Sequence, residues 1–384
     1  SLLFVPPAEG GGMEIYMNQT FMKEKKILPL VLSMSLPMVI SMAVNSLYNI
    51  IDSYFIAKVS EDAMTALSLV YPVQNLITSI GVGFGIGMNA MIAFYLGAGD
   101  QKSADKTTSI GLVLSVIHGI LLTIGCILCM PSFLRLFTTD TFIMDLALTY
   151  SNIAFLFSPI ITVGISFEKI FQSVGRMKVS MLAMVFGFVT NIILDPILIF
   201  GLLGFSSMGM KGAALATGIG QTVSLLVYLF FYVYRPLPVK FRKTDAKLQP
   251  NIVSKLYSIG IPATLNMALP SLLISVLNGI LASFSGAYVL VLGVYYKLQT
   301  FIYLSANGIV QGIRPLVGYN YGAGEYRRVK DIYRTALILS SIIMALGTTL
   351  SWIIPKTLYG MFTTNPETIR MGVSALHIIS LGFT

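Results

Sequence analysis

The sequence predicts an all-α integral membrane protein with two six-helix lobes related by a parallel internal duplication. Three observations support this fold class: an apolar composition, apolar windows of helical length, and a repeat at one constant offset. Of the 384 residues, 55% are hydrophobic and only 11% are charged, whereas a soluble chain carries about a quarter charged residues. The excess of apolar surface therefore has to face lipid.

Apolar windows of membrane-spanning length follow one another along the whole chain. A spanning helix needs about 20 mostly apolar residues. Ten windows meet this length, at residues 27–57, 64–96, 108–131, 146–174, 178–201, 210–234, 252–284, 288–318, 335–355 and 368 to the end. Prolines lie inside several of these windows, so we expect bends or tilts.

The basic residues indicate how the helices are oriented. Eighteen Lys and Arg fall on one side of the predicted membrane and five on the other, and cytoplasmic loops are the ones enriched in Lys and Arg. This predicts a cytoplasmic tail at residues 1–26 and a cytoplasmic loop that includes the linker 236–251. The net charge of +9 is thus a sign of topology, and we expect no nucleic-acid partner.

The chain repeats itself at an offset of 225 residues. Matching pairs at this offset are Pro37 and Pro262, Tyr71 and Tyr296, Gln74 and Gln299, Gly83 and Gly308, and Gly87 and Gly312. The run Gly97-Ala98-Gly99-Asp100 likewise matches the run Gly322-Ala323-Gly324-Glu325. Six helices separate the copies, so both enter the membrane from the same side. We predict an N-lobe at 27–235 and a C-lobe at 252–384; a complete second copy would bring the total to twelve helices, of which about ten are present.

Two acidic residues lie well inside predicted spans, where ionisable groups are expensive and mark function. They are Asp52 in the first span and Asp195 in the fifth. Asn191 shares a helix face with Asp195, and Thr217 in the sixth span is expected at the same depth. The cluster predicts a cation-coupling site that takes up and releases H⁺ or holds Na⁺ at the two aspartates. The alternative is that Asp52 is a water-exposed helix end and Asp195 an ordinary buried acid.

Further polar side chains lie on two helix faces that cannot face lipid. On the first span Asn45 and Asn49 share the face of Asp52. On the eighth span a stripe follows at spacings of three or four residues: Lys297, Thr300, Tyr303, Asn307, Gln311 and Arg314. We expect both to line a substrate cavity between the lobes. The alternative for the stripe is helix–helix contact, with Lys297 and Arg314 extending towards opposite sides of the membrane.

Other features argue against an enzyme. No Walker sequence, nucleotide-binding domain or catalytic triad occurs, so active transport would have to use an ion gradient. The two cysteines, Cys126 and Cys129, lie in one apolar window and are expected to be small packing residues. We expect no cofactor besides the coupling ion, H⁺ or Na⁺.

Four segments carry a resemblance to a known family. They are Leu47-Tyr48-Asn49-Ile50-Ile51-Asp52, Asn191-Ile192-Ile193-Leu194-Asp195-Pro196, Lys211-Gly212-Ala213-Ala214-Leu215-Ala216-Thr217 and Pro315-Leu316-Val317-Gly318-Tyr319-Asn320-Tyr321-Gly322-Ala323-Gly324. In this order they resemble the multidrug and toxic compound extrusion (MATE) transporters, over nearly all of residues 22–384.

The resemblance implies a V-shaped pair of lobes that exports amphipathic, often cationic, organic compounds by alternating access, in exchange for H⁺ or Na⁺. In the DinF-like branch the positions of Asp52, Asn191, Asp195 and Thr217 form the cation site. The expected setting is the cytoplasmic (inner) membrane of a bacterium, with a monomer contacting lipid and small organic substrates.

Two other classes compete with this function. A lipid-linked glycan flippase of the related superfamily would also use a cationic cavity between lobes and would bind pyrophosphate through Lys297 and Arg314. A channel or receptor is disfavoured by the duplicated lobes and the paired aspartates.

Overall fold

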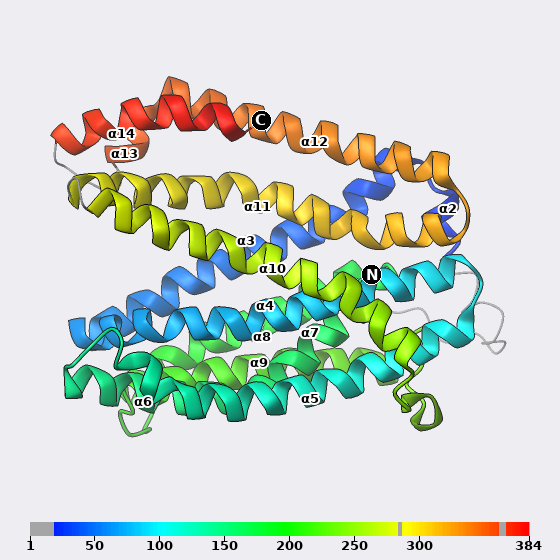
Figure 1. Ribbon diagram of the computed structural model, residues 1–384, viewed down its shortest axis with the longest axis horizontal. Helices are drawn as coiled ribbons and strands as arrows, with labels where there is room; N and C mark the ends of the chain where they lie inside the picture. The colour runs from blue at the N-terminus through cyan, green and yellow to red at the C-terminus, as the bar shows by residue number, and fades with distance from the viewer. Residues whose placement is uncertain (1–18, 283–285, 361–365, 384) are drawn as a thin grey trace.

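The protein is a bundle of long helices (Figure 1). The computed structural model describes residues 19–282, 286–360 and 366–383, and within these ranges it contains no strand. Seven of the described helices are long and apolar enough to cross a bilayer, and the bent pair α6 and α7 adds an eighth span. The predicted all-α, multi-pass membrane fold is confirmed.

The described residues of the first half form one short helix and seven longer ones. They are α2 (Phe21–Glu24), α3 (Ile27–Val59), α4 (Glu61–Gly97), α5 (Gln101–Leu134), α6 (Thr141–Leu156), α7 (Ser158–Ser173), α8 (Met177–Phe200) and α9 (Met210–Tyr234). Capping side chains explain several helix starts: the Ser60 hydroxyl accepts from Ala63 N at the start of α4, and Asp100 accepts from Ser103 N at the start of α5. Each satisfies a backbone N–H that has no partner within the helix.

The second half repeats this plan. Its elements are η1 (Lys243–Ala246), α10 (Pro250–Ala282), α11 (Gly286–Gly322), α12 (Tyr326–Ile353), α13 (Pro355–Gly360), α14 (Pro366–Ile379) and η2 (Ser380–Phe383). At the offset of 225 residues, the starts of α4, α5 and α6 map onto the starts of α11, α12 and α14. The end of α4 at Gly97 likewise maps onto the end of α11 at Gly322.

The predicted window 146–174 differs from the structure, which breaks it into α6 and α7 with a bend of 47°. The bend lies at Phe157, next to Pro159 in the first turn of α7. Proline has no backbone N–H to continue the preceding helix. The apolar pattern runs through both helices unchanged, and Pro159 is the sequence feature that predicted a bend in this window. The short helices α2 and α13 were not predicted either.

Contacts between the two halves are reciprocal at the same offset. A Cβ on Gly83 of α4 would lie 2.6 Å from Thr264 N of α10. A Cβ on its counterpart, Gly308 of α11, would lie 2.8 Å from Val39 N of α3. Residue 39 is the counterpart of residue 264 at the same offset. The same reciprocity holds for a second pair: a Cβ on Gly97 would collide with Tyr319 O, and a Cβ on Gly322 would collide with Phe94 O. Gly322 and Tyr319 are the counterparts of Gly97 and Phe94. Paired contacts of this kind are the mark of a two-fold interface, here between two halves of one chain.

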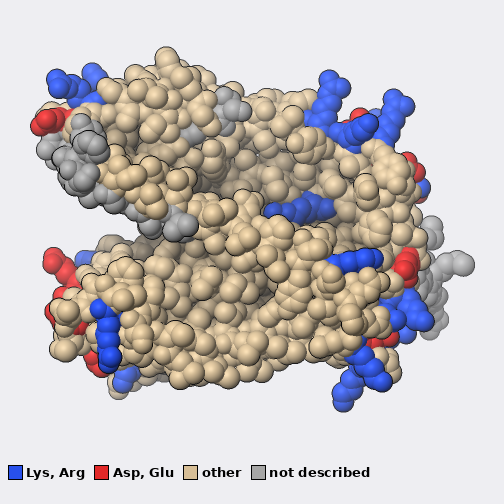
Figure 2. All heavy atoms as spheres, in the orientation of Figure 1, with Lys and Arg blue, Asp and Glu red and all other residues tan. Residues whose placement is uncertain are grey.

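The two halves separate towards one end of the bundle. In Figure 1, α3 runs from the upper right to the lower left, and α10 runs from the lower right to the upper left. Most Lys and Arg side chains gather at the right-hand end, which we call the basic end (Figure 2). At the left-hand end, which we call the opposite end, the surface is hollowed between the halves (Figure 2).

Candidate functional site

The four predicted cation-site residues come from three helices that pack together. Asp52 lies on α3, Asn191 and Asp195 lie on α8, and Thr217 lies on α9. The helix α8 packs against both α3 and α9. At 1.5 Å per residue, Asp52, Asp195 and Thr217 are each about 8–10 Å from the ends of their helices at the opposite end. The structure thus brings them together at one depth.

A glycine pair allows α8 and α9 to approach closely at this level. A Cβ on Gly220 would lie 2.7 Å from Gly187 O and 3.1 Å from the Asn191 Cβ. A Cβ on Gly187 would lie 2.8 Å from Gly220 O. The approach places the Asn191 side chain against α9, where its Nδ2 donates to Thr217 Oγ1 at 3.3 Å.

The acidic pair is buried, and three of its four carboxylate oxygens accept no hydrogen bond from a described donor. Asp195 is 0% exposed and Asp52 is 8% exposed. No N–H or O–H of the described residues donates to Asp52 Oδ1, to Asn191 Oδ1 or to either carboxylate oxygen of Asp195. The two carboxyls interact electrostatically with each other. A proton held between them would supply a donor, and an oxygen-only set of this kind also suits Na⁺.

The sequence prediction missed three residues of this site. The hydroxyls of Tyr48 and Tyr150 both interact with Thr217, and the Tyr150 hydroxyl accepts from Gln74 Nε2 at 3.2 Å. Tyr48 also stacks on Phe188 with ring centroids 5.1 Å apart. Tyr48 lies one turn before Asp52 on the same helix face, which is a signal that could have found it. Tyr150 and Gln74 reach the site from α6 and α4, and no spacing in the sequence indicates that.

The predicted cavity residues of α3 lie next to each other. Asn49 Nδ2 donates to Asn45 O at 2.8 Å and to Asn45 Oδ1 at 3.3 Å. Asn49 is exposed and Asn45 is half-buried. These amides therefore lie along one helix face, with Asn49 available to a solute.

The residues of the predicted stripe on α11 differ in exposure and in what they contact. Thr300 and Asn307 are exposed, and Tyr303 is half-buried against the apolar cluster of α11, α13 and α14. Gln311 Nε2 contacts Met42 Sδ of α3 at 3.6 Å, across the two halves. Arg314 interacts electrostatically with Glu168 of α7. Lys297 lies on α11 as well, and its side chain is outside the described residues.

Glu168 forms a second buried polar cluster, on the side of the basic end. The prediction placed this residue at a helix end, but its carboxylate is buried in α7, five residues before the helix ends. Glu168 Oε1 accepts from Lys169 Nζ and from Gln172 Nε2, each at 2.7 Å. Asn89 of α4 donates to Lys169 O at 3.1 Å. The charge of Arg314 on α11 acts electrostatically on this cluster from the other half of the chain.

Two helical lobes hollowed between them at one end, with a buried acidic pair in the first lobe, define a multi-pass membrane transporter. The MatE family model matches residues 37–197 and residues 262–384. The two matches begin 225 residues apart, which is the offset of the internal repeat. The chain belongs to the MatE family.

Relatives of known function and known structure agree with this family. The chain is 27% identical to the multidrug export protein MepA of Staphylococcus haemolyticus over 368 residues, which cover 93% of this chain and 78% of the relative. It is 26% identical over 359 residues to MepA of Staphylococcus aureus, with the same shares covered.

Solved structures share the fold. An outward-facing MATE transporter of the MOP superfamily superposes with a TM-score of 0.88 at 24% identity, covering 95% of this chain and 81% of that one. A MOP superfamily transporter from Pyrococcus furiosus superposes with a TM-score of 0.87 at 24% identity over the same shares.

Proposed function

We propose that this protein is a secondary active multidrug antiporter, which exports amphipathic, often cationic, organic compounds in exchange for H⁺ or Na⁺. The relatives named as multidrug export proteins support the substrate class. The observation that carries the ion coupling is the buried Asp52–Asp195 pair: Asp52 Oδ1 and both carboxylate oxygens of Asp195 accept no hydrogen bond from the described residues. Two adjacent buried carboxylates need a cation to balance their charge.

The residues around the pair have separate roles in this proposal. Asp52 and Asp195 exchange the cation, and Asn191 and Thr217 hold the side chains of α8 and α9 in register around it. Tyr48 and Tyr150 restrict access of water to the pair, because both rings pack within the lobe. A proton moving inward supplies about 2.3 kcal/mol per 100 mV of membrane potential.

The substrate would enter the space between the lobes. Asn45, Asn49, Thr300, Tyr303, Asn307 and Gln311 are the polar groups proposed to contact it, with Lys297 and Arg314 at the ends of the stripe. The basic end would face the cytoplasm, with the N-terminus on that side. The hollow at the opposite end would then open outward, and alternating access would close it.

A flippase is less well supported. That function would need the cations of the stripe free to bind a pyrophosphate. Arg314 is instead half-buried, and the carboxylate of Glu168 attracts it electrostatically. We therefore retain the antiporter as the proposed function.

The test is to replace each aspartate by asparagine. Asp52→Asn and Asp195→Asn keep the side-chain volume but remove the exchangeable charge. Each should abolish gradient-driven efflux of a fluorescent organic cation from proteoliposomes, while the variants in detergent still bind the compound. Asp145→Asn is the matched control, because Asp145 is exposed on α6 of the same lobe.

The coupling ion is identified in the same vesicles by imposing a pH gradient and a Na⁺ gradient separately. If Na⁺ is the ion, it should raise the unfolding temperature of the unaltered protein but not of the asparagine variants. Full efflux by the Asp52→Asn, Asp195→Asn double variant would disprove the first-lobe cation site.

A further inference from the structure

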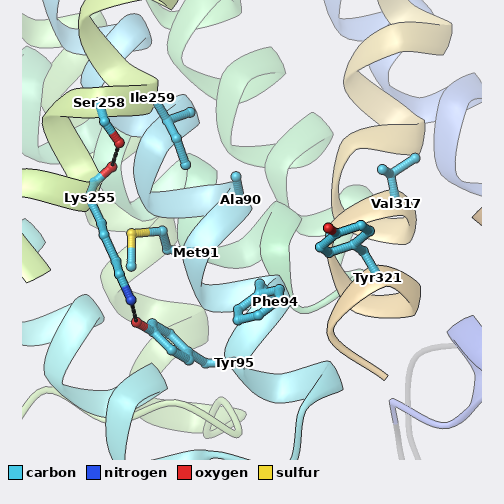
Figure 3. A pocket seen from close by; sticks show the side chains of 10 residues that line it. Ala90, Met91, Phe94, Tyr95, Lys255, Ser258, Ile259, Val317 and Tyr321 are labelled. Atoms are coloured by element: carbon cyan, nitrogen blue, oxygen red, sulfur yellow. Dashed lines mark hydrogen bonds between the residues drawn. The ribbon is translucent and has the colours of Figure 1, made fainter. Parts of the chain in front are cut away.

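A pocket lies between the two lobes near the basic end, away from the acidic pair. Its volume is about 420 Å³. Three helices line it: α4 of the first lobe and α10 and α11 of the second (Figure 3). The lining residues are Ala90, Met91, Phe94, Tyr95, Lys255, Ser258, Ile259, Val317, Gly318 and Tyr321. Phe94, Ile259 and Tyr321 are also exposed on the molecular surface, so the pocket is open to the surroundings.

The lining changes from polar to apolar with depth in the membrane. Lys255 is five residues from the start of α10, which is about 8 Å, and the helix is longer than the hydrocarbon core requires. The ammonium group therefore lies at headgroup level. Its Nζ donates to Tyr95 OH at 3.4 Å and lies 5.9 Å from the centre of that ring. One to two turns deeper the wall is apolar, with Ala90, Met91, Ile259 and Val317 (Figure 3).

The counterpart of this pocket in the internal repeat is filled by the chain itself. At the 225-residue offset Met91, Phe94 and Ile259 correspond to Leu316, Tyr319 and Met34. These three lie in one buried cluster with Met22 of α2, which is 0% exposed. The counterpart of Tyr95 is Asn320, and its Nδ2 donates to Met22 O at 3.1 Å. The segment before α3 thus occupies the equivalent position.

The segment before α10 does not do the same. The linker instead packs on α5, where η1 contacts that helix. Gln101 Nε2 donates to Pro238 O at 2.7 Å, Lys240 N donates to Asp105 Oδ1 at 2.9 Å, and Arg242 N donates to Ser109 Oγ at 3.0 Å. The pocket therefore remains open beside α10.

We propose that this pocket binds an anionic phospholipid of the membrane leaflet at the basic end. Lys255 pairs with the phosphate, Tyr95 and Tyr321 contact the headgroup region, and one acyl chain follows the apolar wall. No lining residue is acidic, so the charge of the pocket is positive and complements an anionic headgroup. Because helices of both lobes line the pocket, a bound lipid contacts both lobes at once.

The test uses native mass spectrometry of the purified, delipidated transporter with added phosphatidylglycerol or phosphatidylcholine of identical chains. Phosphatidylglycerol should bind about fivefold more tightly, as expected for one lysine near an anionic headgroup. Lys255→Gln should remove this preference and leave phosphatidylcholine binding unchanged. Lys243→Gln is the matched control, since Lys243 is an exposed lysine of η1 at the same end, and it should keep the preference.

A second variant tests the pocket rather than the charge. Ile259→Trp places a large ring in the apolar wall at an exposed position and should reduce binding of both lipids. The unfolding temperature of each variant without added lipid shows that it is folded. A preference for phosphatidylglycerol that survives Lys255→Gln would overturn the proposal. So would undiminished binding in Ile259→Trp, or displacement of the lipid by millimolar inorganic phosphate, which would indicate a site for free phosphate.

Discussion

At the scale of single residues, the Glu168–Lys169 pair shows how this protein accommodates charge within the membrane. The Lys169 side chain is 3% exposed and the Glu168 side chain is 12% exposed. Gln172 interacts with both partners, donating to Glu168 Oε1 and accepting from Lys169 Nζ at 3.2 Å. The pair is therefore neutral overall and hydrogen-bonded, which lowers the cost of burying each charge.

Removing one partner should be costly. Lys169→Met leaves the Glu168 carboxylate buried without its closest cation, and such changes destabilise by about 3–5 kcal/mol. We expect a loss of this size in the free energy of unfolding, measured by equilibrium denaturation in mixed micelles. The double variant Glu168→Gln, Lys169→Met should recover part of the loss, because it removes both charges.

The exposed ion pair Lys23–Glu325 provides the control for this measurement. Its atoms are 2.9 Å apart, but the two side chains are 46% and 42% exposed. Lys23→Met should lower the free energy of unfolding far less than Lys169→Met does, because solvent-exposed pairs contribute little. Equal losses in Lys23→Met and Lys169→Met would show that burial of the Glu168–Lys169 pair has no special energetic role.

At the scale of helices, close packing of α8 and α9 determines the geometry of the proposed cation site. Gly187 and Gly220 face each other, and a Cβ added to either one would lie less than 3 Å from the carbonyl oxygen of the other. Backbone atoms cannot move aside as a flexible side chain can. Any larger residue therefore has to separate the two helices.

Gly220→Ala tests this packing. The added methyl group should push α9 away from Asn191, lengthen the contact of Asn191 with Thr217 and reduce coupled efflux strongly. Transport and unfolding are measured on the same preparation. Gly125→Ala is the matched control, because a Cβ on Gly125 of α5 meets no atom within 4 Å.

The control variant should be as active as the unaltered protein and slightly more stable, since alanine favours a helix over glycine by about 1 kcal/mol. If Gly220→Ala retained full efflux and stability, the close approach of α8 and α9 would not be needed for coupling.

At the scale of the whole molecule, the two lobes meet through paired helices on either side of a pseudo-two-fold axis. The helix α4 packs on α10 and α11, and α11 packs on α3. One of the contacts between lobes joins His118 of α5 to Tyr257 of α10, with Nε2 and the hydroxyl oxygen 2.7 Å apart. Alternating access requires contacts of this kind to open and close during each cycle.

A reversible cross-link tests that requirement. In a chain with Cys126 and Cys129 replaced by serine, His118→Cys and Tyr257→Cys are joined by a short bis-thiosulfonate reagent. Efflux should stop when the link forms and return when a reductant cleaves it. Each single-cysteine variant treated with the same reagent is the control. Continued efflux by the fully linked protein would show that this contact does not open during transport.

The amino-acid sequence by itself determined the membrane class, eight of the ten predicted spans, one of them bent, and the internal repeat. These follow from local composition, because a helix that faces lipid must be apolar over a fixed length. The common depth of Asp52, Asn191, Asp195 and Thr217 was also predictable, since helix rise and the bilayer set the depth of each residue independently of its neighbours. The assignment of these residues to a cation site stays a prediction.

Only the tertiary structure decided which residues from distant parts of the chain meet. Tyr150 and Gln74 join the site from other helices, and Glu168 interacts electrostatically with Arg314 of the other lobe. Met22 fills one of two equivalent positions, while the other stays open beside Lys255. The path of the linker along α5, away from the pocket, was likewise decided by the tertiary structure. Each depends on packing between segments far apart in the sequence, and neither hydropathy nor helical periodicity contains that information.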